Sequence, residues 1–493
     1  MSRDRDPGGA QETVAAVGSP ASPAIDEPGA LGRAALRFTT WSERWVPDAF
    51  VFALAATAIV FVAGVASGAG AGEVVDAWGK GFWELLAFTL QMALVIITGS
   101  VLAATPLVGR FIRALASRPR SPRGAVALVA LFAMASAWIN WGFSLIFSAV
   151  LAKEIARRVR GADYRALAAA SFLGLGSVWA QGLSGSAALQ MATRGALTPR
   201  IREIVSASGV VPDGIVSFRH TIFLWQSLAS VGIELVIVTL ILWLAAPPAS
   251  RARTASDLGI ELAASEVEST ESTAPASLGE RLERSTLLNW IFVLLGTAYL
   301  IRYFRGASEG LYSLNLNTLN LAFLVLGFAL HRTPARLMAA VRNATPAVWG
   351  VILQFPFYAG IAGIITYTHL NERIANLFVH VSSHATFPAL IALYSALLGV
   401  FVPSGGSKWV IEAPYVMTAA HQLKVHLGWM VAVYDLGEAL ANLIQPFWML
   451  PTLAFFGLRA RDVMGYTFVV FLLLLPIVLV MVTLFGLTLH YPL

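Results

Sequence analysis

The chain has 493 residues, of which 57% are apolar and 13% are charged, with a net charge of +6 and no cysteine. A typical soluble domain carries about 25% charged residues, so the composition places the chain among integral membrane proteins. The lack of cysteine excludes disulfides, thiolate metal sites and cysteine nucleophiles. The positive charge does not indicate a nucleic-acid partner, because the arginines fall in short loops between apolar segments, as in the cytoplasmic loops of membrane proteins.

The chain begins with a polar segment, residues 1–40, that is rich in proline, glycine, alanine and acidic residues and lacks the apolar run of a signal peptide. We expect it to be a disordered tail on the cytoplasmic side of the membrane. Apolar runs long enough to cross the roughly 30 Å hydrocarbon layer follow along nearly the whole chain. Examples are 48–68, 290–301 with its flanks, and 466–487.

A second polar insert divides the membrane region into two parts. Residues 247–285 include the sequence ASDLGIELAASEVESTESTAPAS and are predicted to form a cytoplasmic linker. The linker separates a first membrane repeat, 41–246, from 286–493, which holds a linking span and a second repeat.

The two membrane parts resemble each other weakly but in a constant register. LLAFTLQMALVIITG around Gln91 resembles WGVILQFPFYAGIAG around Gln354, which lies 263 residues later. The same offset carries the sequence NWG at 140–142 onto PSG at 403–405, the other conspicuous polar break in an apolar stretch. A repeat of this length is typical of a transporter with two duplicated halves.

Arginine-rich loops predict how the first half lies in the membrane. The segments 110–123 and 153–165 are rich in arginine and should both be cytoplasmic. Between them lies only the apolar stretch 125–150, which is broken at Asn140. The chain must therefore enter and leave on the same side, as a re-entrant helical hairpin that opens to the cytoplasm.

Arginine-rich loops predict the opposite membrane orientation for the second half. The arginines of 332–342 should be cytoplasmic, so the next span crosses outward and 388–420, broken at FVPSGGSKW, becomes a hairpin that opens to the outside. We therefore predict an all-α polytopic membrane protein with two inverted-topology repeats. Each repeat has a re-entrant helical hairpin and a broken transmembrane helix.

Helix breaks are the first candidates for a binding site, because unpaired backbone groups in hydrocarbon cost several kcal/mol each. Besides the two hairpin tips, breaks occur at 174–185 (GLGSVWAQGLSG) and 442–451 (NLIQPFWMLP). In each half the break follows its hairpin, so tip and broken helix can face each other and present half-helix N-termini to an anion. The alternative is that glycine and serine there only permit close helix packing. Four breaks in register favour the binding site.

Ionisable residues in the second half could take part in such a site. At its hairpin tip, backbone amides and the hydroxyls of two serines could hold a carboxylate. Lys408 stands four residues before Glu412, so it either pairs with Glu412 on one helix face or contacts the substrate. Asp435 and Glu438 lie one turn apart in an apolar span and either bind Na⁺ or relay protons, or are solvated near the outer interface.

Other polar residues give no sign of catalysis. Gln91 and Gln354 are interpreted as polar contacts between helices. His380 and His384 are one turn apart but have no evident third metal ligand. We find no phosphate-binding loop, dinucleotide fingerprint or nucleophile elbow, so the sequence predicts neither an enzyme nor a cofactor. A membrane enzyme would need a cluster of His, Asp and Glu at one membrane face.

Ordered sequence blocks from about Trp41 to Leu487 resemble the short-chain fatty acid transporter family, the acetoacetate and butyrate uptake type, within the larger ion-transporter superfamily. The blocks are WVPDAFVFA, WGKGFWELLAFTLQMALVIITG, WINWGF, AKEIARRV, LQFPFYAGI, FVPSGGSKWVIEAPY, QPFWMLP and GLRARDVMGY. The resemblance implies cation-coupled uptake of short monocarboxylates, with Na⁺ or H⁺ as the coupling ion, by an elevator-like protein of the bacterial cytoplasmic membrane. A dicarboxylate substrate is the alternative, and a homodimer is compatible with the sequence.

The resemblance also implies which residues bind substrate and ion. By position, the hairpin-tip ligands fall on Asn140, Trp141, Gly142 and Ser144 in the first half and on Ser404, Gly405, Gly406 and Ser407 in the second, with Lys408 beside them. The paired helix breaks would supply Ser177, Gln181, Gly182, Asn442 and Gln445.

Overall fold

A computed structural model shows how these segments fold. It describes residues 49–207, 209, 211, 213–262, 277–308, 310–368, 370–401, 405–445 and 448–493. Every regular element within these ranges is a helix. The predicted tail lies outside the described residues, as do 263–276 of the predicted linker. The described parts of the linker hold one short turn, η4 (Ser256–Leu258), and one short helix, α12 (Leu278–Glu283).

The chain is an all-helical polytopic membrane protein. In the described residues, seven stretches are long and apolar enough to cross a membrane: Leu86–Ala103, Pro122–Ile139, Tyr164–Ala192, Trp225–Ala245, Thr286–Gly306, Trp349–Tyr367 and Ala460–Gly486. Three shorter apolar helical segments accompany them: Ala53–Ala66, Leu316–His331 and Phe387–Val400.

The first hairpin consists of α6 (Pro122–Ile139) and α7 (Trp141–Arg158), which pack against each other. α6 begins where the Ser121 hydroxyl accepts a hydrogen bond from the Gly124 amide, with proline at the first helical position. Asn140 is the single extended residue between the two helices, and its side chain accepts from the Phe143 amide. One asparagine therefore both ends α6 and caps α7.

The broken helix of the first half consists of α8 (Tyr164–Gly176), the turn η1 (Trp179–Gln181) and α9 (Ser186–Ala192). Its break packs on the end of α6, where the Leu183 amide donates to the Trp138 carbonyl at 2.7 Å. A Cβ on Gly182 would clash with the same carbonyl, so only glycine permits this approach.

The second half repeats this order of helices. It comprises α16 (Trp349–Tyr367), α17 (Leu370–Val381), α18 (Phe387–Phe401), α19 (Gly405–Gln422), α20 (Leu427–Ala441) and α21 (Met449–Phe456). Shifting the first-half α4 (Leu86–Ala103) by 263 residues gives 349–366, and shifting α8 gives 427–439. The helices α5 (Pro106–Ala116), α6, α7 and α9, shifted by the same 263 residues, match α17, α18, α19 and α21 within two residues at each end. The helix boundaries thus recur at the offset on which the predicted repeat was based.

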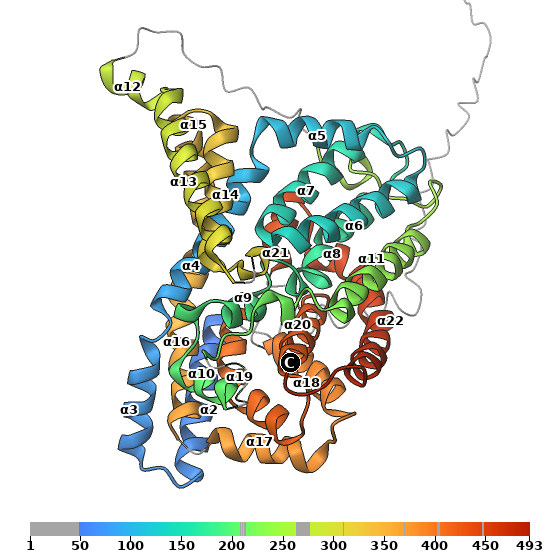
Figure 1. Cartoon of the computed structure of the whole chain (residues 1–493). Coiled ribbons are helices and arrows are strands. Elements are labelled where there is room, and N and C mark those ends of the chain that lie inside the picture. The colour runs from blue at the N-terminus through green and yellow to red at the C-terminus, as the bar shows by residue number, and fades with distance from the viewer. Residues whose placement is uncertain are drawn as a thin grey trace, which may run out of the picture.

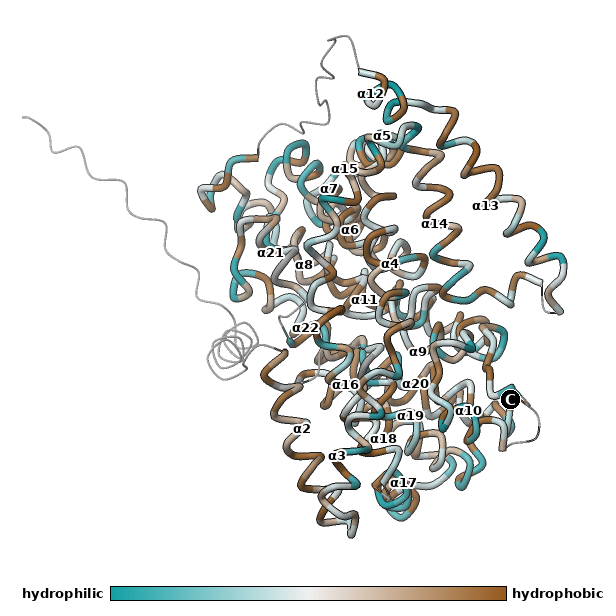
Figure 2. The backbone as a smooth tube through the Cα atoms, turned by 90° about the vertical axis from the view of Figure 1, so that its left-hand side faces the viewer, coloured by the Kyte–Doolittle hydropathy of each residue, from teal (hydrophilic) through white to brown (hydrophobic). Residues whose placement is uncertain are grey.

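The two broken helices form the centre of the molecule. Every residue of α20 is buried, and all but one residue of α8 are buried as well. Apolar helices such as α2 (Ala49–Ala66) and α13 (Thr286–Gly306) lie at the periphery (Figure 2). Their exposed leucines, isoleucines and valines have no protein to cover them, which fits a surface that faces lipid.

The remaining helices complete the bundle. They are α3 (Ala71–Phe82), α10 (Pro199–Ser206), α11 (Trp225–Ala245), α14 (Leu316–His331), α15 (Pro334–Ala344) and α22 (Ala460–Gly486). Figure 1 shows α5 and α15 at one end of the molecule and α17 at the other. The arginine-rich segments that contain α5 and α15 therefore lie together, far from the segment that contains α17.

Candidate functional site

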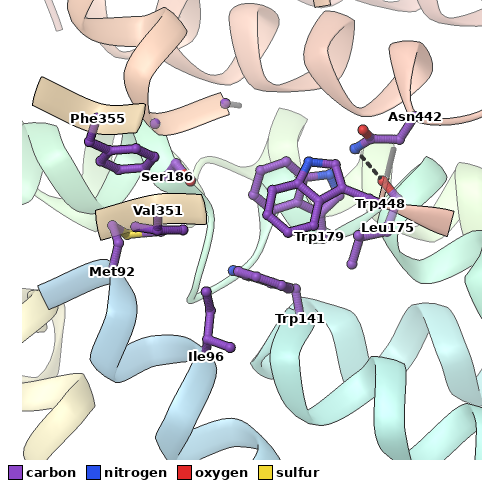
Figure 3. Close-up of a pocket in the computed structure, with 12 residues that line it drawn as sticks. Met92, Ile96, Trp141, Leu175, Trp179, Ser186, Val351, Phe355, Asn442 and Trp448 are labelled. Atoms are coloured by element: carbon purple, nitrogen blue, oxygen red, sulfur yellow. Dashed lines mark hydrogen bonds between the residues drawn. The ribbon is translucent and has the colours of Figure 1, made fainter. Parts of the chain in front are cut away.

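A small pocket lies where the hairpin tips and the helix breaks of both halves meet (Figure 3). Its volume is about 30 Å³, which is room for about two water molecules. A four-carbon carboxylate would fit only after lining side chains move. The lining residues are Met92, Ile96, Trp141, Leu175, Trp179, Ser186, Val351, Phe355, Gly405, Gly406, Asn442 and Trp448.

Tryptophans form one wall of the pocket, two of them from the first half and Trp448 from the second. The rings of Trp141 and Trp179 meet edge to face with centroids 6.4 Å apart, and Trp448 lies 5.5 Å from Trp141. The indole nitrogens of Trp141 and Trp179 are buried and have no hydrogen-bond partner among the described residues. In Figure 3 the nitrogen end of the Trp141 ring points towards the middle of the pocket. Two buried donors are therefore available at a mostly apolar site, and a buried donor is costly to leave unpaired.

Glycines form the wall contributed by the second tip. Gly405 and Gly406 begin α19, so their amides belong to the first turn and have no partner within the helix. Their carbonyls accept hydrogen bonds from the Tyr434 hydroxyl at 2.5 Å and from Gln190 Nε2 at 2.6 Å. A Cβ on Gly405 would lie 2.9 Å from the Trp179 ring. Glycine is therefore required for the α19 N-terminus to approach the tryptophan wall.

Asn442 links the two breaks. Its Nδ2 donates to the Leu175 carbonyl at the end of α8, at 3.0 Å (Figure 3). Its Oδ1 accepts from Gln445 Nε2 at 2.8 Å. Asn442 thus lines the pocket with a side chain that already has partners, while Gln445 supports it from behind.

Of the predicted site residues, Trp141, Gly405, Gly406 and Asn442 line the pocket, and most of the others do not. Asn140 caps α7, as described above. The hydroxyls of Ser144 and Ser177 each donate to a backbone carbonyl at 2.7 Å, Ser144 to Ala133 and Ser177 to Leu173. These three side chains satisfy the backbone at the tip and the break.

Three further predicted residues also lie outside the lining. Gly142 packs with its Cα near the backbone of Ile96, and Gly182 packs on α6. Gln181 donates to Glu234 at 2.7 Å, a fully buried carboxylate on α11 that the sequence analysis did not single out. Ser404 and the side chain of Ser407 are not among the described parts of the structure.

Lys408 is fully buried and does not line the pocket. Its ammonium group lies 2.6 Å from Glu438 and 3.5 Å from Glu412. The predicted pairing with Glu412 is therefore the weaker contact, and the close partner comes from the neighbouring helix α20. Asp435 and Glu438 are also buried, so the alternative in which they are solvated at the outer interface is wrong.

Sequence reasoning missed most of the apolar lining, above all Trp179, Trp448 and Phe355. Trp179 lies inside the glycine-rich break of the first half, and a large aromatic residue between glycines was the signal that could have identified it. Gln91 was interpreted as a contact between helices, and its Nε2 does donate to Asn317 on α14 at 2.7 Å.

Comparison with known proteins gives consistent matches along the chain. A family model described as short chain fatty acid transporter matches residues 30–485. A protein of Escherichia coli strain K12, provisionally named as a short-chain fatty acid transporter, is 38% identical over 438 residues, which cover 88% of this chain and 96% of that protein. A protein of the same provisional name from Haemophilus influenzae is 34% identical and covers 91% of this chain and 99% of its own length.

Two solved transporter structures share the fold at low sequence identity. The Alcanivorax borkumensis YdaH transporter, described as having an unusual topology, aligns with a TM-score of 0.53 at 16% identity, over 89% of this chain and 97% of that one. Neisseria gonorrhoeae MtrF aligns with a TM-score of 0.56 at 12% identity, over 93% and 98%. At these identities the likeness concerns the fold alone.

Proposed function

The chain belongs to the short-chain fatty acid transporter family, and from this premise we propose that it carries short monocarboxylates such as butyrate or acetoacetate across the bacterial cytoplasmic membrane by secondary active transport. The family consists of transporters, so the protein is a transporter and not an enzyme.

The observation that supports this substrate class is the character of the pocket. Aliphatic and aromatic side chains such as Met92, Val351 and Phe355 suit a short alkyl chain. The indole N–H groups of Trp141 and Trp179 and the amides at the start of α19 suit a single carboxylate. No cationic side chain occurs in the described lining, whereas a dicarboxylate would call for a second charged partner.

In this proposal the two halves form an inverted repeat, with α6–α7 and α18–α19 as re-entrant hairpins whose tips meet at the substrate. The equal spacing of the helices and the convergence of both tips on one pocket support it. The N-terminus is then cytoplasmic. Uptake is coupled to a cation, because a bacterium that accumulates an anion against its inside-negative potential needs an inward cation gradient.

The direct test is binding of butyrate to purified protein, followed by indole fluorescence. The pocket must widen to admit the ligand and three tryptophans line it, so butyrate should change the fluorescence in a saturable way. Gly405→Val fills the space between the α19 tip and the Trp179 ring and should abolish saturable binding. Gly465→Val is the matched control, because a Cβ at Gly465 in α22 meets nothing within 4 Å.

Counterflow of labelled acetoacetate in proteoliposomes then links binding to transport. The wild type and Gly465→Val should exchange substrate, and Gly405→Val should not. The proposal is wrong if the wild type binds neither butyrate nor acetoacetate, or if Gly405→Val transports normally.

A further inference from the structure

A cluster of four charged side chains lies behind the second hairpin tip. Lys408 and Glu412 lie one turn apart on α19, and Asp435 and Glu438 lie one turn apart on α20. All four are essentially inaccessible, with exposed fractions of 0%, 0%, 0% and 1%. One cation therefore faces three carboxyl groups in a site that water does not reach, a charge imbalance that burial makes expensive.

Lys408 Nζ has three close oxygen acceptors. Its Nζ donates to the Ser395 carbonyl at 2.6 Å and to the Ser395 hydroxyl at 2.7 Å. The third close acceptor is Glu438 Oε2 at 2.6 Å. All three contacts are shorter than the 3.5 Å between Lys408 Nζ and Glu412 Oε1, so Lys408 compensates the charge of Glu412 less than that of Glu438.

The charge of Glu412 is compensated less well than that of Glu438. Its nearest cation is Lys408, at 3.5 Å from Glu412 Oε1, a longer contact than the 2.6 Å between Lys408 and Glu438. Asp435 differs, because it faces the amides of Ala187 and Ala188 at the start of α9. An ionised carboxylate at the position of Glu412 would be buried with little compensation, so the group gains by binding a proton.

In the part of the chain that the structure describes, two charged groups act on Glu412. Lys408 on its own helix and Glu438 on α20 interact electrostatically with Glu412. Three phenol groups also feel the charge of Glu412: Tyr394 of α18, Tyr415 of α19 and Tyr434 of α20. The helices α10, α16 and α17 also pack on α19, and their titratable side chains are Arg200, Arg202, Glu203, Tyr358, Tyr367, Glu372, Arg373 and His380. None of these appears among the groups that act on Glu412.

We propose that Glu412 is the coupling-ion site of the transporter and that the ion is a proton, held by Glu412 in the field of the Lys408–Glu438 pair. This inference rests on the proposed function and specifies its coupling. In the transport step Glu412 takes up one proton from water as a carboxylate and releases it on the other side, with no change in any other bond.

The arrangement favours a proton over Na⁺. A sodium ion needs several oxygen ligands around one point, and the point between Glu412 and Glu438 is occupied by the ammonium group of Lys408. In the part of the chain that the structure describes, no three acidic or histidine side chains converge as metal ligands would.

The cluster is close enough to the pocket to sense a bound anion. Gly405 lines the pocket on one side, and a Cβ placed on it would lie 3.2 Å from Glu438 Cγ on the other. The Tyr434 hydroxyl, which contacts the Gly405 carbonyl, belongs to a ring 4.9 Å from the Lys408 ammonium. A carboxylate in the pocket adds negative charge beside Glu438, and a proton on Glu412 offsets it. Anion and proton therefore each favour binding of the other, which is the requirement for symport.

The test is the number of protons taken up when butyrate binds. Calorimetric titration of the purified full chain in buffers with different ionisation enthalpies measures this number directly. We expect the wild type to take up protons when butyrate binds, and its affinity for butyrate to fall by up to about tenfold per pH unit as the pH rises through the titration of the group. Glu412→Gln, which imitates the protonated group, should bind butyrate with no proton uptake and little pH dependence.

Glu154→Gln is the matched control. Glu154 is a carboxylate on α7, the helix that begins at Trp141, but it pairs with Arg157 and Arg158 about 20 Å further along the helix. Its removal should leave proton uptake as in the wild type. Repeating the wild-type titration with Na⁺ replaced by choline should change nothing.

The outcomes separate this inference from the proposed function. Butyrate binding without proton uptake in the wild type, or with proton uptake unchanged in Glu412→Gln, overturns the proton site and leaves the transport function standing. Butyrate affinity that depends on Na⁺ and not on pH also overturns the proton site and leaves the transport function standing. Failure of the wild type to bind any short carboxylate overturns the proposed function itself. If Glu412→Gln does not fold, the wild-type measurement alone can still overturn the inference, because the absence of proton uptake excludes a proton site at Glu412.

Discussion

Helices α6–α9 and α18–α21 follow the same order, with boundaries offset by 263 residues. Gly174 in α8 and Gly437 in α20 occupy equivalent positions in these two sets of helices. A Cβ on Gly174 would lie 2.5 Å from the Ala133 carbonyl of α6, and a Cβ on Gly437 would clash with the Ala392 carbonyl of α18. Both halves therefore pack the broken helix against the hairpin by the same device, a glycine at a close helix crossing.

The two sets of helices differ in charge at equivalent positions. Lys408, Glu412, Asp435 and Glu438 of the second half correspond to Leu145, Ala149, Phe172 and Leu175 of the first. Conversely, Trp179 of the first half corresponds to Asn442. The common packing positions the pocket, while the first half supplies aromatic donors to it and the second half supplies the buried charges behind it. The two sets of helices therefore share this packing contact and differ in the side chains they bring to the pocket.

The largest expected effect comes from removing the cation of the second half. Lys408→Met leaves Glu438 buried beside α18 without its partner and should destabilise the protein by about 3 to 5 kcal/mol. Leu145→Met is the matched change at the equivalent position of the first half and should cost less than about 1.5 kcal/mol, because it conserves volume and removes no charge. Unfolding in mixed detergent micelles measures both.

The double variant Lys408→Met with Glu438→Gln sharpens this test. It removes both charges of the close pair and should recover much of the lost stability. If Lys408→Met with Glu412→Gln recovers more, then Glu412 is the main partner of Lys408 and the assignment of the close pair to Glu438 is wrong.

Removing an indole N–H donor of the first half should weaken the affinity for butyrate and leave folding intact. Trp141→Phe keeps the ring but removes the indole N–H, so it should weaken butyrate binding by about 10- to 100-fold, since a hydrogen bond to a charged group contributes about 1.5 to 3 kcal/mol. Trp138→Phe is the control: its indole nitrogen is also buried and unpaired in the described structure, yet Trp138 does not line the pocket. Equal affinities for the two variants would remove Trp141 from the recognition site.

The shared glycines should respond alike in both halves. Gly174→Ala and Gly437→Ala each force two helices apart and should each cost about 1 to 3 kcal/mol of stability. Gly232→Ala in α11 should be neutral or slightly stabilising, because its Cβ meets nothing within 4 Å and alanine is the better helix former. Thermal unfolding compares the three. A large cost at Gly174 with none at Gly437 would show that the two crossings are not equivalent.

These features differ in how far the sequence could predict them. Helix breaks in apolar stretches are local and costly, so the tip at Asn140 and the break after Gly176 could be located from residue type and register. Side-chain partners between helices could not. The sequence offers Glu412 as a partner of Lys408, as the alternative to substrate contact, because the two stand four residues apart on one helix. Glu438 comes thirty residues later and approaches from another helix, which a sequence does not display.

The polar side chains at the breaks also have partners that a sequence does not display. Asn140, Ser144 and Ser177 are predicted ligands, and in this structure their side chains bond to backbone groups. The residue that lines the pocket beside them, Trp179, is apolar in character and was not considered. In a pocket lined mainly by apolar side chains, aromatic residues within a break are as informative as polar ones.

The last prediction concerns two variants whose stability and affinity should equal those of the wild type. It tests whether the two halves have opposite orientations in the membrane. Ser117 follows α5 and Ser383 follows α17, the helices that correspond to each other at the 263-residue offset. Both serines are exposed, and α5 and α17 lie at opposite ends of the molecule (Figure 1). If the repeats are inverted, Ser117 lies in the cytoplasm with its arginine-rich neighbours and Ser383 lies outside.

The chain has no cysteine, so Ser117→Cys and Ser383→Cys each introduce a single reactive thiol without any background. A membrane-impermeant maleimide added to intact cells should label Ser383→Cys only, and Ser117→Cys should react only after the membrane is opened. Uptake of butyrate should match the wild type in both variants, because neither serine lines the pocket. Labelling of both thiols from the same side would show that equivalent helices have the same orientation, and a parallel duplication would then have to replace the inverted one.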